Sequence, residues 1–134
     1  MGISELVESY EAATKQFLDA VATVGPEELD KAPAGEWTPR QIIHHQAHAD
    51  AYCLTRIIQV VSEPGTTVRS FSEEALVSSK ILSYESAPIE PSISLLIALR
   101  SETLRIIKLC TDADLSLACV HSELGEFTLQ DMII

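Results

Sequence analysis

The sequence lacks the features that mark several large classes of protein. It has no apolar run near the roughly 18 residues needed to span a bilayer, and its N-terminus has no basic and apolar signal-peptide segment. Lys and Arg total only nine, against 20 Asp and Glu, so the formal net charge is −11. Proteins that bind phosphate groups use clustered cations. We therefore expect a cytoplasmic protein with no nucleic-acid partner and no membrane partner.

Paired cysteines and familiar catalytic motifs are also missing. The three cysteines, Cys53, Cys110 and Cys119, include no CxxC pair, and an odd number does not suit a disulfide framework. We expect them to be small core residues in a reducing compartment. The sequence has no glycine-rich phosphate loop, no GxSxG motif and no HExxH motif. Any chemistry must therefore come from another arrangement of side chains.

What the chain does have is enough apolar material for one compact domain. It has 134 residues, of which 46% are hydrophobic. Such a chain can bury a sizeable core and is too apolar to be disordered. No internal repeat, low-complexity tract or long linker divides it. A single domain is therefore expected over residues 1–134.

Apolar spacing and end signals predict the first two helices. Residues 3–24 carry apolar side chains at helical intervals, and Gly25-Pro26 ends the pattern. Thr38-Pro39-Arg40-Gln41 is a strong start signal, because it combines an N-cap, a proline at the first helical position and a capping-box glutamine. This second helix is expected to reach Ser62, before Glu63-Pro64-Gly65.

The second half of the chain predicts one more long helix and the start of another. Ser72-Glu73-Glu74 resembles a helix start, but nearby prolines limit the length of any helix there. A long helix is expected from Pro91 or Ser92 to about Cys110, and residues 111–127 are expected to be loop or short extended chain. Residues 128–131 form another capping box, so a fourth helix begins there and the sequence ends inside it. The prediction is an all-α fold, a four-helix bundle with its fourth helix only begun.

Three of the four histidines lie within five residues, His44-His45-Gln46-Ala47-His48. Residues three or four apart share a helix face, and neutral imidazoles are ligands for zinc, nickel and similar divalent metals. Two histidines fall short of the three protein ligands usual for zinc, and a solvated histidine-rich face is the alternative. On a helical wheel, His44 and His48 lie on the exposed side. His45 lies at the border of the apolar arc, where it can face a groove between helices.

Other polar residues are weaker candidates for a site. Asp50 falls within the apolar arc, where a carboxylate needs a partner. It can hydrogen-bond a metal-ligating histidine, pair with an arginine, line a cavity, or lie partly hydrated at the open end of the bundle. His121 is either a further ligand or a solvated or capping residue. Glu123 and Glu126 flank Gly125 and are expected to shape a turn.

The stretch from Gly35 to His45, GEWTPRQIIHH, resembles the start of the second helix in the DinB-like superfamily. The resemblance is to the branch described as metal-dependent hydrolases, some of whose members act as thiol S-transferases. Later segments are similar in order. Ala87-Pro88 precedes a long helix, and residues 120–129 stand where that branch has a His-Pro-Glu-x-Gly stretch before its last helix. The resemblance spans the chain from about residue 30.

The resemblance implies a four-helix bundle, often dimeric, that holds a divalent metal through three histidines. One of them lies eight positions after the tryptophan, which is His45 here. The other two belong to an H-x-x-x-H pattern in the last helix, which has no counterpart in this sequence. Where relatives commonly carry Asp, this chain has His48, which is the second candidate ligand. The metal implied is zinc or nickel.

Two functions are expected as alternatives. The first is a metal-dependent enzyme, a hydrolase or thiol S-transferase acting on a small molecule. The second is a non-catalytic bundle, small-ligand-binding or stress-associated, that has lost its metal site. Three explanations of the truncated last helix are open: residues are omitted from the sequence, the gene is shortened, or the metal site is lost. A bundle lacking most of one helix exposes an apolar groove, so a homodimer is expected.

Overall fold

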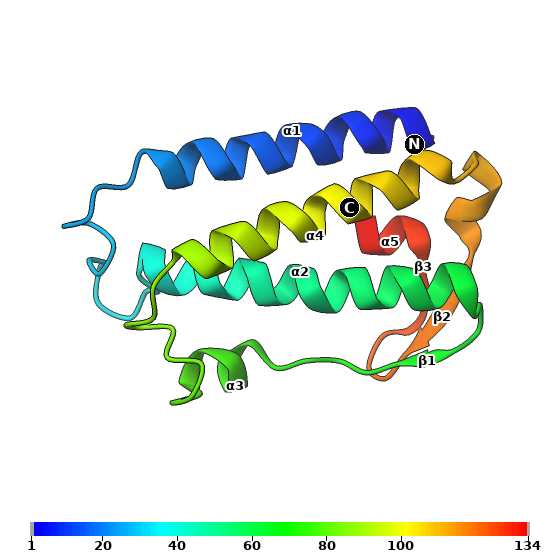
Figure 1. The fold of residues 1–134 in the computed structure, drawn as a ribbon. Coiled ribbons are helices and arrows are strands. Elements are labelled where there is room, and N and C mark those ends of the chain that lie inside the picture. The colour runs from blue at the N-terminus through cyan, green and yellow to red at the C-terminus, as the bar shows by residue number, and fades with distance from the viewer. Residues whose placement is uncertain (1, 134) are drawn as a thin grey trace.

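The computed structural model describes residues 2–133, and three long helices dominate that range (Figure 1): α1 (Ile3–Ala22), α2 (Pro39–Ser62) and α4 (Glu90–Leu109). The shorter helices are α3 (Glu73–Ser78), α5 (Leu129–Ile133) and the 3₁₀ turn η1 (Asp112–Ser116). This mostly helical architecture confirms the predicted class. None of the helices among residues 2–133 combines the length and the apolarity that a membrane crossing requires.

The ends of α2 match their sequence signals. The Gln41 N–H donates to Thr38 Oγ1 at 3.2 Å, and the Thr38 N–H donates to Gln41 Oε1 at 2.9 Å. This capping box satisfies backbone donors that the first helical turn leaves free. The helix ends at Ser62, and Gly65 follows with a φ of 89°, which side chains other than glycine rarely adopt. The first helix, α1, ends at Ala22, two residues earlier than expected.

A small sheet closes one end of the bundle. Within residues 2–133 it consists of β1 (Thr67–Val68), β2 (Ala118–His121) and β3 (Gly125–Thr128), in that order. Strand β1 pairs with β2 in parallel, with Thr67 opposite Val120, and β2 pairs with β3 as an antiparallel hairpin. The extended segments β2 and β3 fall mostly within the region expected to be loop or short extended chain. The two-residue β1 carries no recognisable pattern of its own.

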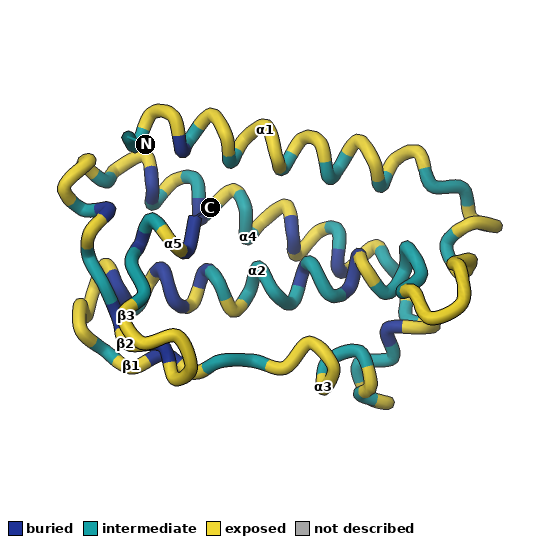
Figure 2. The backbone as a smooth tube through the Cα atoms, turned by 180° about the vertical axis from the view of Figure 1, so that it is seen from behind, coloured by how far each residue is buried: buried dark blue, intermediate teal, exposed yellow. Residues whose placement is uncertain are grey.

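The hydrophobic core gathers where the sheet meets the helices. It is formed by Leu6, Ile57, Val60, Val68, Ile107, Leu115, Cys119, Leu129, Met132 and Ile133. Figure 2 shows buried positions along α2 and α4, whereas α1 is mostly exposed or half-buried. Within α1, all of which the structure describes, Leu6 is the one buried residue. The helix pair α2–α4 therefore forms the packed part of the bundle, and α1 covers only one side of it.

Candidate functional site

His44 lies inside the protein and holds three segments together. Its Nε2 lies 2.9 Å from the carbonyl oxygen of Ala87, and its Nδ1 lies 2.6 Å from the Ser92 hydroxyl. A carbonyl can only accept, so Nε2 carries the proton and Nδ1 accepts from Ser92. Both ring nitrogens are therefore occupied. The expected exposed position was wrong, since His44 is 3% exposed: the segment before α4 covers this face of α2.

His48 is half-buried and faces Tyr84, which belongs to the same covering segment. The Nδ1 of His48 lies 2.5 Å from the Tyr84 hydroxyl. Burial, with a smaller contribution from Tyr52, raises the pKa of Tyr84 to about 12, so its hydroxyl keeps the proton and donates it to Nδ1. Burial first, and then the neighbouring His44 and His45, lower the pKa of His48. The ring is thus kept neutral, with only Nε2 left for another interaction.

His45 differs from both neighbours because neither of its ring nitrogens has a good hydrogen bond. Its Nδ1 is buried and has no hydrogen-bond partner among the described residues. Its Nε2 lies 3.5 Å from Glu73 Oε1 at the start of α3, which is long for a hydrogen bond. The edge-on ring of Trp37 packs against it, with 5.0 Å between the ring centroids. His45 is therefore held in place by packing, and neither of its ring nitrogens is committed to a hydrogen bond of good geometry.

These contacts indicate how well the side chains around His45 suit a metal ion. A buried, unpartnered imidazole nitrogen suits a ligand, and a carboxylate near the other nitrogen is a common accompaniment of metal-bound histidine. His45 therefore fits the predicted role. No group of three His, Cys, Asp or Glu side chains within residues 2–133 is placed to hold a metal. The described residues thus offer part of a donor set, centred on His45 with Glu73 nearby, and do not complete one.

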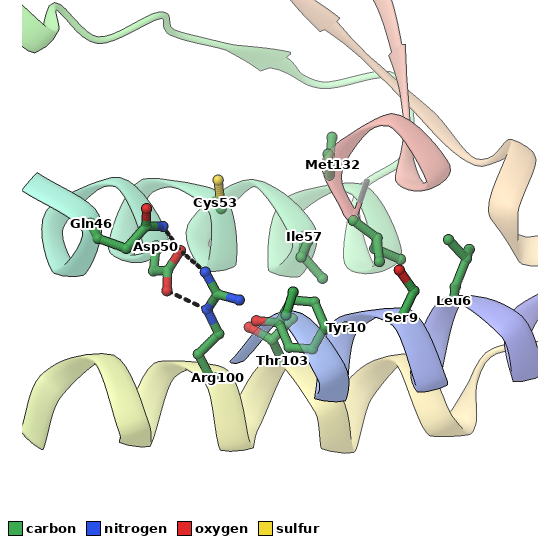
Figure 3. A pocket seen from close by; sticks show the side chains of 12 residues that line it. Leu6, Ser9, Tyr10, Gln46, Asp50, Cys53, Ile57, Arg100, Thr103 and Met132 are labelled. Atoms are coloured by element: carbon green, nitrogen blue, oxygen red, sulfur yellow. Dashed lines mark hydrogen bonds and ion pairs between the residues drawn. The ribbon is translucent and has the colours of Figure 1, made fainter. Parts of the chain in front are cut away.

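Asp50 pairs with an arginine, one of the arrangements considered for it. Arg100 on α4 contacts it through Nε and Oδ2 at 2.5 Å and through Nη2 and Oδ1 at 3.2 Å, and Gln46 donates to it at 3.0 Å (Figure 3). The same guanidinium donates to Thr14 and lies over the Tyr10 ring. This network borders a cavity of about 400 Å³ between α1, α2, α4 and α5. Arg100 could not be identified from the sequence, because no local motif links it to Asp50.

His121 stabilises a turn and does not approach the histidines of α2. It is buried in β2, and its Nδ1 accepts hydrogen bonds from the N–H groups of Glu123 and Leu124, both at 3.1 Å. The capping interpretation is therefore the one the contacts match. Gly125 has a φ of 75°, as the tight turn between β2 and β3 requires. Glu123 and Glu126 lie on this turn and its following strand, as expected.

The three thiols are free and poorly suited to act as nucleophiles. Cys119 is buried, and Cys53 and Cys110 are half-buried. Burial raises the pKa of each of them above its ordinary value. A thiol reacts through its thiolate, which a raised pKa disfavours. None of the three cysteines is therefore a good candidate for a catalytic nucleophile.

Comparison with known proteins gives a consistent result. A family model of the DinB superfamily matches residues 9–134. Similar curated proteins include one from Oceanobacillus iheyensis and one from Geobacillus kaustophilus, each named "putative metal-dependent hydrolase". The first is 25% identical over 95% of this chain and 73% of its own length; the second is 29% identical over 84% and 62%. The chain thus spans 62% to 73% of the length of these two relatives.

The fold is also similar to a solved structure. That structure is YfiT from Bacillus subtilis, described as a probable metal-dependent hydrolase with an unusual four-helix bundle topology. The TM-score is 0.85, at 22% identity, over 98% of this chain and 75% of that chain. A similarity at this level of identity establishes the fold.

Proposed function

Because the chain belongs to the DinB superfamily, we propose that it is a divalent-metal-dependent enzyme that hydrolyses a small molecule. The proposal rests mainly on the surroundings of His45. This residue is the one histidine of the α2 triplet whose ring nitrogens are not committed to good hydrogen bonds. It also occupies the position that the family resemblance assigns to the first metal ligand. The curated relatives, named as metal-dependent hydrolases, point in the same direction.

Each nearby side chain has a distinct role in this proposal. His45 supplies a nitrogen ligand, and Glu73 places a carboxylate oxygen 3.5 Å from its Nε2. His48 is the second proposed nitrogen ligand, through Nε2, since Tyr84 occupies its Nδ1. Zinc or nickel is the proposed metal, since both accept imidazole nitrogen. Such a metal supplies a Lewis acid and lowers the pKa of what it binds.

The attacking group distinguishes two versions of the chemistry. Burial raises the pKa of the three cysteines, so the protein's own thiols are poor nucleophiles. With water as the nucleophile the reaction is a hydrolysis. With an external thiol and a small electrophile it is a thiol S-transfer, which the family resemblance also implies. We propose the cytoplasm as the place of action, because free cysteines persist in a reducing compartment.

A non-catalytic small-ligand-binding or stress-associated bundle is the second candidate, and one observation favours it. Both nitrogens of His44 and the Nδ1 of His48 already serve structural hydrogen bonds. The α2 histidines are thus largely used to hold the covering segment in place. In this version His45 is a remnant of a lost metal site.

Metal binding separates the two candidates, and the protein contains a reporter for it. Trp37 is the only tryptophan, and its ring packs against His45. Titration of the metal-free protein with Ni²⁺ should quench Trp37 fluorescence saturably. His45→Ala should abolish the quenching, because the ligand beside the tryptophan is gone. His121→Ala, at the far turn, should leave it intact. Elemental analysis of the purified protein provides an independent measurement.

Each other outcome has a clear meaning. No saturable Ni²⁺ or Zn²⁺ binding would overturn the enzyme proposal and favour the non-catalytic bundle. Saturable binding that persists unchanged in His45→Ala would show that the metal lies elsewhere. A separate metal titration of His48→Ala tests the second proposed ligand. This substitution should lower the affinity for the metal without changing the far-ultraviolet circular dichroism of the protein.

A further inference from the structure

A second hollow lies along α2, on the side covered by α3. Its volume is about 640 Å³, within the roughly 300–1,000 Å³ of small-molecule sites. Tyr52 lines it from α2, the segment 69–72 and α3 line it from the other side, and Glu123 reaches it from the β2–β3 turn. The chain links this cleft to the proposed metal ligand: Ser72 lines the cleft, and the carboxylate of the next residue, Glu73, lies 3.5 Å from His45 Nε2.

The cleft has a preformed aromatic wall. The rings of Tyr52 and Phe71 are stacked, with centroids 4.5 Å apart and an interplanar angle of 13°. The guanidinium of Arg56 lies over Phe71, with its central carbon 5.2 Å from the ring centroid. Arg56 also donates to the Arg69 carbonyl at 2.7 Å, which fixes the segment that carries Phe71. Tyr52 is nevertheless 42% exposed. A rigid, partly open aromatic surface is suited to stack a planar apolar group.

Arg69 provides the cleft with an available positive charge. Three of the five arginines form ion pairs, with Asp30, Asp50 and Glu102, and the buried Arg56 is held by Phe71 and a carbonyl. The exposed Arg69 has no ion pair among residues 2–133. In a chain of net charge −11, most surface positions repel an anion. A guanidinium at a cleft wall is well suited to pair with a carboxylate.

The other charged side chains of the two cavities narrow the class of ligand further. Glu123 also faces the cleft, so a second negative charge on the ligand would be repelled. The cavity between α1, α2, α4 and α5 is a poorer anion site, because Asp50 already neutralises its arginine, Arg100. Entry of an anion there would have to break that ion pair. In the cleft beside Tyr52, Glu123 is also present, but Arg69 forms no ion pair among the described residues that an entering carboxylate would have to break.

We infer that this cleft is a recognition site for a small molecule that joins an aromatic ring to a single carboxylate. The ring packs on Tyr52 and the carboxylate pairs with Arg69. That the bound molecule is a substrate rests on the proposed function, since Glu73 connects the cleft to His45. Binding itself requires no metal, so the two ideas can fail separately.

Phenylacetate is the simplest probe, and phenylacetamide is its uncharged counterpart. Binding is measured by ligand-observed NMR titration in excess EDTA. Phenylacetate should bind saturably, and phenylacetamide and acetate should bind at least about tenfold more weakly, as expected for loss of a charge-assisted hydrogen bond or of the stacked ring. Arg69→Gln should lower the affinity for phenylacetate to that for phenylacetamide, and it should leave the affinity for phenylacetamide unchanged. Arg105→Gln, an exposed arginine on α4, is the matched control and should bind like the wild type.

Two results would overturn the inference: absence of saturable phenylacetate binding, and equal binding by Arg69→Gln and wild type. Because Arg69 is exposed and its side chain has no ion pair among residues 2–133, the substitution should not disturb folding. If phenylacetate binds as expected but the metal titration fails, the proposal of a metal-dependent hydrolase is overturned and the proposed binding site stands. If the metal binds but phenylacetate does not, only the proposal for the cleft is overturned.

Discussion

His44, His45 and His48 occupy little more than one turn of α2, and their ring nitrogens meet different surroundings. His44 bonds a hydroxyl and a carbonyl, His48 bonds a phenol, and the Nδ1 of His45 has no partner among residues 2–133. A buried polar atom without a partner costs free energy. The structure therefore carries that cost at the position where a ligand is proposed, while the two flanking rings stabilise the segment around it.

Removing His44 should destabilise the fold more than its size suggests. His44→Ala leaves the Ser92 hydroxyl without its acceptor, removes one of the two donors to the Ala87 carbonyl (Arg40 is the other), and opens a space beside Tyr84. We expect the free energy of unfolding to fall by roughly 2–4 kcal/mol, measured by urea denaturation. Ser92→Ala should cost about 1 kcal/mol. The exposed Ser101→Ala on the same helix should be neutral. A His44→Ala loss no larger than that of Ser101→Ala would contradict the assigned role.

His48 should make stability depend on pH. Its pKa in the folded protein is below the ordinary value of 6.5, so the unfolded chain binds the proton more readily. The stabilisation is therefore fully present above pH 6.5 and is lost as the pH falls through the folded pKa. His48→Gln cannot titrate. The stability difference between wild type and His48→Gln should shrink from about pH 8 to about pH 5, measured in EDTA. A constant difference would contradict the prediction.

At the scale of elements, the start of α2 determines where these histidines lie. The capping box at Thr38 fixes the first turn, and His44 and His45 follow within the next turn. Thr38→Ala should lower the free energy of unfolding by about 1 kcal/mol. The same substitution should make the Gln41 and Ile42 amides exchange their hydrogens faster. Thr55→Ala, in the exposed middle of the same helix, should change stability by less than about 0.5 kcal/mol. Equal effects of the two substitutions would argue against the cap.

Elements whose signals are local were predictable, and contacts between distant segments were not. The caps at Thr38, Ser72 and Thr128 all exist in the structure, because a cap involves residues only three positions apart. The expected exposure of His44 was wrong because the segment that carries Tyr84 covers it, and no periodicity in α2 reports that segment. Arg100 was missed for the same reason, since its partner lies on another helix. His45 was predicted from the family resemblance, and its metal remains a proposal.

At the scale of the whole molecule, the uneven packing of α1 bears on assembly. Apolar side chains of α1 and α2, including Phe17, Val21 and the 44%-exposed Ile42, line a shallow hollow between these helices. We propose that a second copy covers this side, giving a homodimer. Light scattering after size-exclusion chromatography should show a dimer, and Ile42→Glu should convert it to a monomer. Leu109→Glu, at the opposite end of α4, should leave it dimeric. A wild-type monomer at micromolar concentration would contradict this proposal.

The parallel pairing of β1 with β2 also implies an order for the steps of folding. Thr67 and Val120 lie far apart along the chain, with α3 and α4 between them. Closing so long a loop is entropically costly until the intervening helices have packed, and non-local contacts of this kind slow folding. We therefore expect α2 and α4 to associate first and the strands to pair afterwards. The face that carries His45 would then be shaped early, while the sheet end, with Cys119 and Leu129, closes last.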